Sequence, residues 1–248
     1  MNEKPYLSVI IPAYNEGETI SSTLVDVDKY LSKQKYTSEI LVVSDGSKDT
    51  TAEKAKNMQS LIKNLRVIDN KENHGKGWVV RQAMLEANGQ IRLFMDADNA
   101  TTVDHFDKMK PLFDQGYEVV IGTRDPKDAK GAKKSKEQPF WKSALGNMGN
   151  IAIQLMAIWG IWDTQCGFKA FTEIATKNIF SRMRIDRWAF DVESLALARK
   201  LGYKIGIIPV NWIDNPNSRV NLKAYLRFLK ELFIIKGNFI TNKYSLKD

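Results

Sequence analysis

Cysteine, histidine and long apolar runs are scarce in this sequence. The single cysteine, Cys166, rules out an intrachain disulfide and fits a reducing compartment. The two histidines, His74 and His105, have no cysteine near them, which argues against a zinc site. The longest apolar stretch, residues 151–162, is well short of the roughly 20 residues that cross a bilayer. Residues 1–6 lack the apolar core of a signal peptide. We therefore expect neither a disulfide-stapled secreted protein nor a transmembrane one.

Negative charge is also in deficit. With 37 Lys and Arg against 29 Asp and Glu, the formal net charge is +8. Such an excess suits an anionic partner, whether nucleic acid, a phosphorylated ligand or an acidic membrane surface, and it is equally typical of a basic surface that keeps a protein soluble. The 248 residues, 43% of them hydrophobic, suffice for one large α/β domain, or for one domain with a small appendage.

The first half of the chain alternates between short β-rich runs and helical segments. Strands are predicted at residues 7–11, 40–43, 65–68, 91–95 and 118–122. Helical connections between them imply a mostly parallel sheet with helices on both faces, whose ligands bind beyond the carboxyl ends of the strands. The polar clusters of this half all follow strands and are therefore expected on one rim. They are Tyr14-Asn15-Glu16, Asp45-Gly46-Ser47, Lys76 and Asp96-Ala97-Asp98.

The second half has a different pattern. Residues 124–137 form a Lys-rich, turn-prone loop, and residues 140–162 form an apolar helical stretch with three tryptophans. A strand is predicted at residues 204–210. Residues 222–240 repeat apolar side chains on one helical face with lysine and arginine beside them, so residues 216–248 are predicted as a C-terminal amphipathic helical segment.

Asp96 and Asp98 alternate at the end of an apolar strand. Two carboxylates there can hold a hard divalent cation, Mg²⁺ or Mn²⁺, that also takes diphosphate oxygens and neutralises the charge growing on a nucleoside diphosphate leaving group. Asp98 can instead begin a turn or cap a helix near Val103, and an Asp-x-Asp pattern alone is common. The position beyond a buried strand, on the shared rim, favours the metal site.

Other rim residues suit a nucleotide. The Asp45 carboxylate can accept hydrogen bonds from a base or ribose, although an Asx turn explains it equally well. Tyr14 offers an aromatic ring to a nucleoside, while Asn15 and Glu16 are also what a capped helix start would carry. Lys76 lies between two glycines at a helix start, where it can meet a phosphate or base carbonyls, or simply follow a turn.

Together these motifs resemble a known family. Residues 8–16 (SVIIPAYNE), 44–51 (SDGSKDTT) and 96–98 (DAD) are similar to family 2 glycosyltransferases of the GT-A fold, over nearly the whole chain. Within that family, residues 99–101, 122–124, 163–169 and 187–193 resemble dolichyl-phosphate glucosyltransferases. Dolichol-phosphate mannose synthases share the opening motifs but usually have Gln where this chain has Ala100, which favours the glucosyl branch.

The resemblance implies a GT-A nucleotide-diphospho-sugar transferase fold in residues 1–215, divided into a nucleotide-sugar-binding half (residues 1–122) and an acceptor half (residues 123–215). It implies inverting transfer of a hexose, from UDP-glucose or a similar donor, to a polyprenyl or dolichyl phosphate. The implied donor-site residues are Pro12, Ala13, Tyr14, Asn15, Glu16, Asp45, Lys76, Asp96, Ala97, Asp98 and Arg219. The implied acceptor-site residues are Arg124, Lys133, Lys134, Gln165 and Lys169. Asp98, Arg124 and Asp163 are the catalytic candidates.

The acceptor chemistry agrees with this implication. A phosphate monoester is largely a dianion at neutral pH, so it needs cations to position it rather than a general base. Arg124 and the lysines of residues 130–136 can supply them, or can form an ordinary solvated loop. Arg219 matches a basic position that reaches the donor diphosphate in relatives, and a surface ion pair is the competing explanation. If the acceptor were a hydroxyl group, Asp163 or Asp191 would have to act as the base.

A polyprenyl phosphate stays in a bilayer, so we expect a cytoplasmic protein bound peripherally to the cytoplasmic face of a membrane, or to a separate membrane-bound partner. Residues 140–162 and 222–240 are the candidate docking segments. Each can instead be an amphipathic helix packed on the core, and for residues 140–162 the two interpretations have equal support. The alternatives are a GDP-mannose donor, a glycan hydroxyl acceptor, a sugar nucleotidyltransferase and a non-catalytic binding module. Nucleic acid is not expected as a partner, because the rim aspartates would repel phosphates without a metal.

Overall fold

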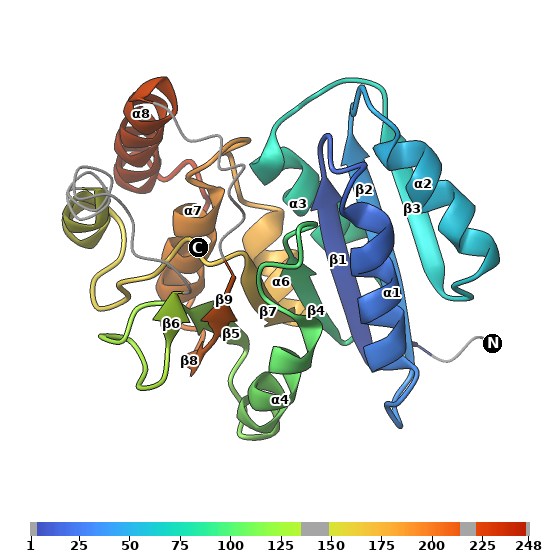
Figure 1. Cartoon of the computed structure of the whole chain (residues 1–248). Coiled ribbons are helices and arrows are strands. Elements are labelled where there is room, and N and C mark those ends of the chain that lie inside the picture. Colours follow the sequence, from blue (N-terminus) through green and yellow to red (C-terminus); the bar gives the residue numbers. More distant parts are fainter. Residues whose placement is uncertain (1–3, 135–148, 214–221, 247–248) are drawn as a thin grey trace.

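The computed structural model describes residues 4–134, 149–213 and 222–246, and its centre is one twisted sheet (Figure 1). Its seven strands lie in the order β3-β2-β1-β4-β7-β5-β8. The strands are β1 (Leu7–Ala13), β2 (Ser38–Asp45), β3 (Leu65–Asn70), β4 (Ile91–Met95), β5 (Val119–Thr123), β7 (Phe168–Thr172) and β8 (Ile205–Pro209). All neighbouring pairs are parallel except those of β7, which is antiparallel to both β4 and β5. The predicted mostly parallel sheet is confirmed, and β7 is a strand that the sequence pattern did not predict.

Helices cover both faces of the sheet. They are α1 (Ile20–Leu31), α2 (Thr51–Asn57), α3 (Lys76–Glu86), α4 (Phe106–Asp114), α6 (Glu173–Phe180), α7 (Phe190–Lys200) and α8 (Leu222–Ile240). Side chains of α1, α2 and α4 form a buried cluster on one face, and those of α3, α6, α7 and α8 form a second cluster on the other. β1, β2, β4 and β5 are buried along almost their whole length, because a sheet covered on both faces buries every side chain of its central strands.

The stretch between β5 and β7 is less helical than expected. Residues 149–156 form a helix, but the chain leaves it before residue 158, and residues 140–148 lie outside the described part. Lys133–Lys134 (β6) pairs with Asn211–Trp212 (β9) as a small separate sheet. This pairing ties the predicted Lys-rich loop to the segment that follows β8.

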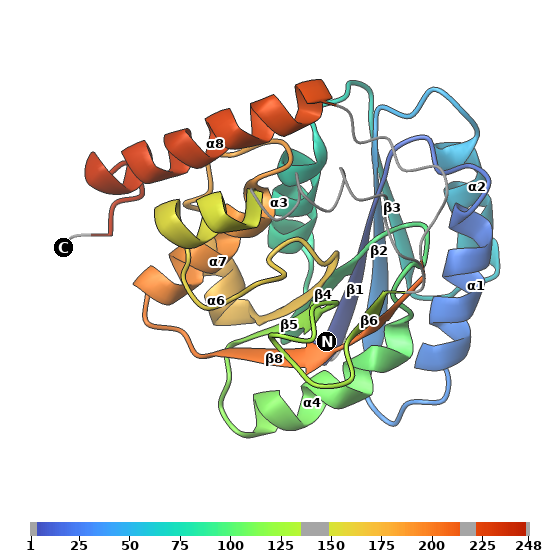
Figure 2. The ribbon, with the colours of Figure 1, turned by 60° about the vertical axis from the view of Figure 1, so that its left-hand side comes forward.

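The last helix, α8, lies along one edge of the molecule beside the helix of residues 149–156 (Figure 2). Phe228, Leu232 and Ile235 pack into the core. Beyond the helix the Tyr244 hydroxyl donates a hydrogen bond to Glu193 at 2.8 Å, which anchors the chain end under α8. In the described residues, no helix combines the length and the apolar character needed to cross a membrane.

Candidate functional site

The rim beyond the parallel strands brings Lys76 and Asp96 together. β4 ends at Met95, so Asp96 is the first residue past the sheet, and α3 begins at Lys76. The Lys76 ammonium donates to Asp96 Oδ1 at 2.5 Å. Burial alone would lower the Lys76 pKa, but the carboxylates of Asp96, Asp191 and Asp98 outweigh it and raise the pKa. Lys76 is therefore a firmly charged cation on the predicted rim.

Asp45, at the end of β2, shapes the turn that presents Lys76. Its carboxylate accepts hydrogen bonds from the backbone N–H groups of His74 and Gly75, each at 2.9 Å, and from Asn73 Nδ2 at 3.0 Å. The side chain is almost fully buried. Gly75 has φ 107°, and a Cβ there would stand 2.5 Å from the Asp186 carbonyl oxygen. Asp45 thus builds the loop from within, and its direct contact with a base or ribose stays a prediction.

The Asp-Ala-Asp segment has the properties of a cation site. Burial, and then the charge of Asp96, raise the pKa of Asp98 above its usual value. A divalent cation would relieve that repulsion between two carboxylates. Asp96 also fills the space above Gly167, where a Cβ would come within 2.0 Å of Asp96 Oδ2. Asp98 Oδ1 accepts from Ala100 N at 3.1 Å, so it makes the expected turn as well.

No cluster of three or more His, Cys, Asp or Glu side chains able to hold a metal occurs among the described residues. A cation held by two carboxylates, those of Asp96 and Asp98, would keep coordination positions for diphosphate oxygens. That is the arrangement that Mg²⁺ prefers. The donor set, two carboxylates with a glycine below one of them, fits Mg²⁺ or Mn²⁺.

The loop after β1 is tied to the loop after β2. Asn15, at φ 54°, donates its backbone N–H to Ser47 Oγ at 3.1 Å and accepts from Lys48 N at 2.8 Å. Glu16 N donates to Thr51 Oγ1 at 2.7 Å. Tyr14 is 37% exposed at this rim, whereas Pro12 and Ala13 lie buried within β1, beside Val43 and Ser44 of β2. Among Pro12, Ala13 and Tyr14, the Tyr14 side chain is therefore the one open to a ligand.

Arg124 and Asp163 form a closed pair at the end of β5. Asp163 accepts hydrogen bonds from Arg124 N at 2.7 Å and from Arg124 Nε and Nη2 at 2.8 Å each. Burial opposes the charged carboxylate, but the Arg124 charge and these bonds lower the Asp163 pKa to about 2. The Trp212 ring lies 5.3 Å from the guanidinium carbon. A carboxylate held in this way is a weak base.

Two further charged residues, Lys169 and Asp191, form an ion pair under the rim that the sequence pattern did not predict. The Lys169 ammonium is fully buried and contacts Asp191 Oδ1 and the Cys166 carbonyl oxygen, each at 2.5 Å. Burial raises the Asp191 pKa, against the pull of Lys169 and Lys76. Lys169 therefore forms part of the floor of the site. Because its side chain is fully buried, the structure does not expose it to an acceptor as the sequence predicted.

The remaining residues predicted for the acceptor and donor sites lie at different depths. Gln165 and Lys133 are exposed. Lys134 contributes its backbone to β6. Arg219 lies outside the described residues. Ala97 is buried, and its carbonyl oxygen accepts from Thr23 Oγ1 at 2.7 Å, which fixes the Asp-Ala-Asp segment to α1.

The seven-stranded sheet and its covering helices have the GT-A architecture, which solved structures share. Glucosyl-3-phosphoglycerate synthase from Mycobacterium tuberculosis, solved with UDP, has a TM-score of 0.67 at 17% identity over 98% of this chain and 82% of its own. A mannosyltransferase from Pyrobaculum calidifontis, solved with GDP-Man and Mn²⁺, has a TM-score of 0.60 at 19% identity, over 88% and 59%.

Sequence comparison then gives the family. The model of Glycosyl transferase family 2 matches residues 8–180. A dolichyl-phosphate beta-glucosyltransferase of Dictyostelium discoideum is 34% identical over 98% of this chain and 77% of its own length. Its human counterpart is 32% identical over 97% and 78%. The chain belongs to glycosyltransferase family 2 and is a glycosyltransferase.

Proposed function

We propose that this enzyme transfers glucose, with inversion, from UDP-glucose to a polyprenyl or dolichyl phosphate at a membrane surface. The observation that carries the proposal is the contrast between the two sides of the site. Lys76, Asp96 and Asp98 present charged groups suited to a diphosphate and a cation, while Asp163 is locked to Arg124. The names of the relatives at 32% to 34% identity support this donor and acceptor class.

On the donor side, Asp96 and Asp98 would hold Mg²⁺ or Mn²⁺, which when bound would neutralise charge on the departing diphosphate. Lys76 adds a cation at the same place, at the N-terminus of α3, where backbone N–H groups also favour an anion. The Tyr14 ring lies open at the rim for the base or ribose. We assign residues 1–122 to the donor half and residues 123–215 to the acceptor half.

On the acceptor side, a phosphate dianion suits the available groups better than a hydroxyl does. A sugar hydroxyl would need a general base. Asp163 has its pKa held near 2, and Asp191 is buried against Lys169, so neither is placed to take a proton from an arriving hydroxyl. A phosphate needs only positioning by cations, for which exposed Lys133 and the partly exposed Arg124 are our candidates.

We place the enzyme peripherally on the cytoplasmic face of a membrane, held there by its own surface or by a membrane-bound partner. The large exposed apolar side chains of α8 support membrane contact. The amphipathic C-terminal segment, residues 216–248, is the part we assign to docking.

Radiolabelled donor and polyprenyl phosphate provide the test. Purified protein with Mn²⁺ or Mg²⁺ is mixed with UDP-glucose, UDP-GlcNAc or GDP-mannose, and label moving into the organic phase is counted. Label transferred from UDP-glucose, and lost in the Asp98→Asn variant, is the expected result. Transfer from GDP-mannose alone would replace the donor. Transfer to a free sugar with none to lipid would overturn the acceptor.

A further inference from the structure

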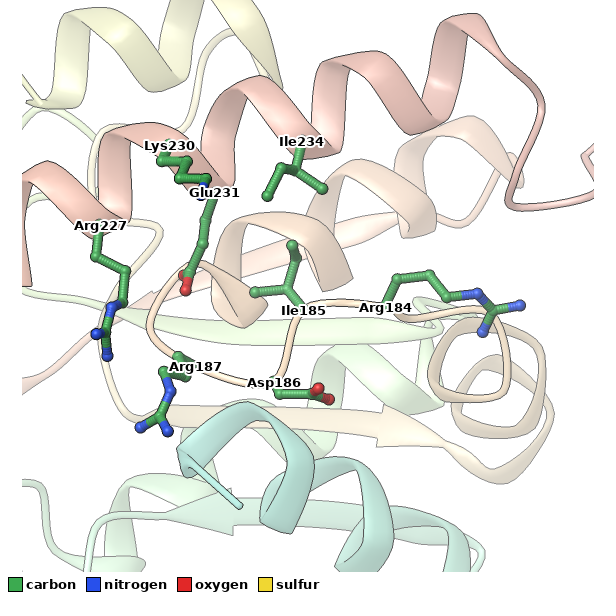
Figure 3. A pocket seen from close by; sticks show the side chains of 8 residues that line it. All are labelled: Arg184, Ile185, Asp186, Arg187, Arg227, Lys230, Glu231 and Ile234. Atoms are coloured by element: carbon green, nitrogen blue, oxygen red, sulfur yellow. The ribbon is translucent and has the colours of Figure 1, made fainter. Parts of the chain in front are cut away.

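A cationic pocket lies under α8 (Figure 3). Its volume is about 340 Å³, and it lies between α8 and the segment of residues 184–187 that leads into α7. Arg184 and Arg187 line it from the segment, and Arg227 and Lys230 line it from α8. The guanidinium groups of Arg187 and Arg227 turn toward the same end of the pocket, and Arg184 lies at the other end.

The positive charges in this pocket exceed the negative ones. Asp186 is already paired with Arg81, Nη2 to Oδ1 at 2.8 Å. Glu231 accepts a hydrogen bond from Ala189 N at 2.9 Å and lies near both Arg187 and Arg227, so it supplies one negative charge to two guanidinium groups.

The cations themselves lack close carboxylate partners. Within the described part of the chain, no carboxylate oxygen lies within 4.0 Å of the charged nitrogens of Arg187, Arg227 or Lys230. These two guanidinium groups face one space and share only the Glu231 carboxylate, which is not within 4.0 Å of either, so an oxyanion can bind between them.

The outer face of α8 indicates that the oxyanion belongs to a membrane lipid. Leu226, Phe233 and Ile240 recur every seven residues and are 59%, 65% and 76% exposed. They form an apolar stripe, and Arg227 and Lys230 border it on the pocket side. An apolar stripe edged by cations is the surface that lies at the headgroup level of an anionic bilayer.

We propose that Arg187 and Arg227, with Lys230 beside them on α8, bind the phosphate of an anionic membrane lipid at one end of this pocket, while the α8 stripe enters the bilayer surface. This inference extends the proposed function, since it rests on an acceptor that resides in a membrane. It adds a lipid site that is separate from the proposed acceptor residues, which follow the last residue of β5.

The segment of residues 184–187, which lines the pocket, also contacts the start of α3 on the donor side of the site. The Asp186 carbonyl oxygen accepts from Trp78 N at 3.0 Å, at the start of α3. The backbone of Ile185 and Asp186 also packs so closely on Gly75 and Gly77 that a Cβ at either glycine would approach it within 2.6 Å. A headgroup held by Arg187 would therefore fix the segment on which Lys76 and its turn are built.

Vesicle flotation with the full chain tests the site. Vesicles of phosphatidylcholine alone are compared with vesicles in which about a third of the lipid is phosphatidylglycerol. Wild type should prefer the anionic vesicles, and Arg227→Gln/Lys230→Gln should lose about 30-fold of that binding, since each cation near an anionic surface contributes roughly a factor of 5. Both side chains are exposed on α8, so the fold should persist.

The matched control removes the same charge elsewhere. Lys33→Gln/Lys63→Gln changes two exposed lysines far from α8 and should bind as wild type does. Equal losses in both double variants, or no loss in the pocket variant, would overturn the site. Inorganic phosphate should displace the protein no better than chloride at equal ionic strength. Stronger displacement would mean that the pocket takes a soluble phosphate, against the proposal.

A second readout separates this inference from the proposed function. Transfer of glucose to a short, water-soluble polyprenyl phosphate needs no bilayer, so the pocket variant should match wild type there and fall behind when the acceptor is embedded in anionic vesicles. If wild type binds anionic vesicles through the pocket but transfers to neither acceptor, the proposed function fails and the lipid site stands.

Discussion

Replacing Asp163 with Asn should destabilise the protein by a measurable and pH-dependent amount. The Asp163 pKa is about 2 in the folded chain against an ordinary value of 3.8. That difference corresponds to about 2 kcal/mol at neutral pH. Asparagine also turns an N–H₂ group toward one of the Arg124 nitrogens and leaves the Arg124 guanidinium, whose side chain is 20% exposed, without its counter-charge, which adds to the cost. We expect a loss of about 2 to 4 kcal/mol in the free energy of unfolding.

The stability that Asp163 contributes should decrease as the pH falls. Because the folded-state pKa is lowered, the stabilisation is fully present above the unfolded value near 4 and is lost as the pH falls through the folded value of about 2. Urea unfolding of wild type and variant is measured from neutral pH down to about pH 2. The gap between them should be widest above about pH 4 and should narrow below it.

An exposed pair serves as the control. Asp114 bridges Lys110 at 3.4 Å with 62% of its side chain exposed, so Asp114→Asn should cost less than about 1 kcal/mol. If Asp163→Asn costs no more than this control, the pair is not a stabilising lock. If its cost stays constant from neutral to acid pH, the loss comes from packing and the electrostatic reasoning is refuted.

Three further predictions concern the motif and the chain end. Asp98→Asn should leave the free energy of unfolding within about 1 kcal/mol of wild type yet remove metal-dependent glucosyl transfer, and full turnover would contradict its role. Gly167→Ala should weaken Mn²⁺ binding in a calorimetric titration, because its Cβ would approach Asp96 Oδ2 to 2.0 Å; unchanged affinity would show that the Asp96 carboxylate moves freely. Tyr244→Phe removes the hydrogen bond to buried Glu193 and should lower the free energy of unfolding by about 1 to 3 kcal/mol; an unchanged urea midpoint would mean that the chain end does not anchor α8.

Much of the fold followed from local pattern. The parallel strands were predictable because continuous apolar runs bounded by glycine, proline and polar clusters are what a doubly covered sheet requires. The rim followed from the same rule, since parallel strands end on one side. β7 was missed because its five residues include a lysine, and a charged side chain in the middle of a sheet contradicts the apolar pattern by which buried strands are recognised.

That lysine also explains why the floor of the site could not be predicted. β7 runs antiparallel between β4 and β5, and the register places Lys169 opposite Phe94. Its ammonium lies 5.3 Å from the centre of the Phe94 ring and within 2.5 Å of Asp191, at the start of α7. Spacing along the chain marks Asp96 as chemically important, but only the strand pairing reveals that a buried cation holds Asp191 in place beneath Lys76. The positive charge of Lys76 therefore interacts with two carboxylates, Asp96 on the rim and Asp191 in the floor of the site, and Asp191 is itself paired with Lys169.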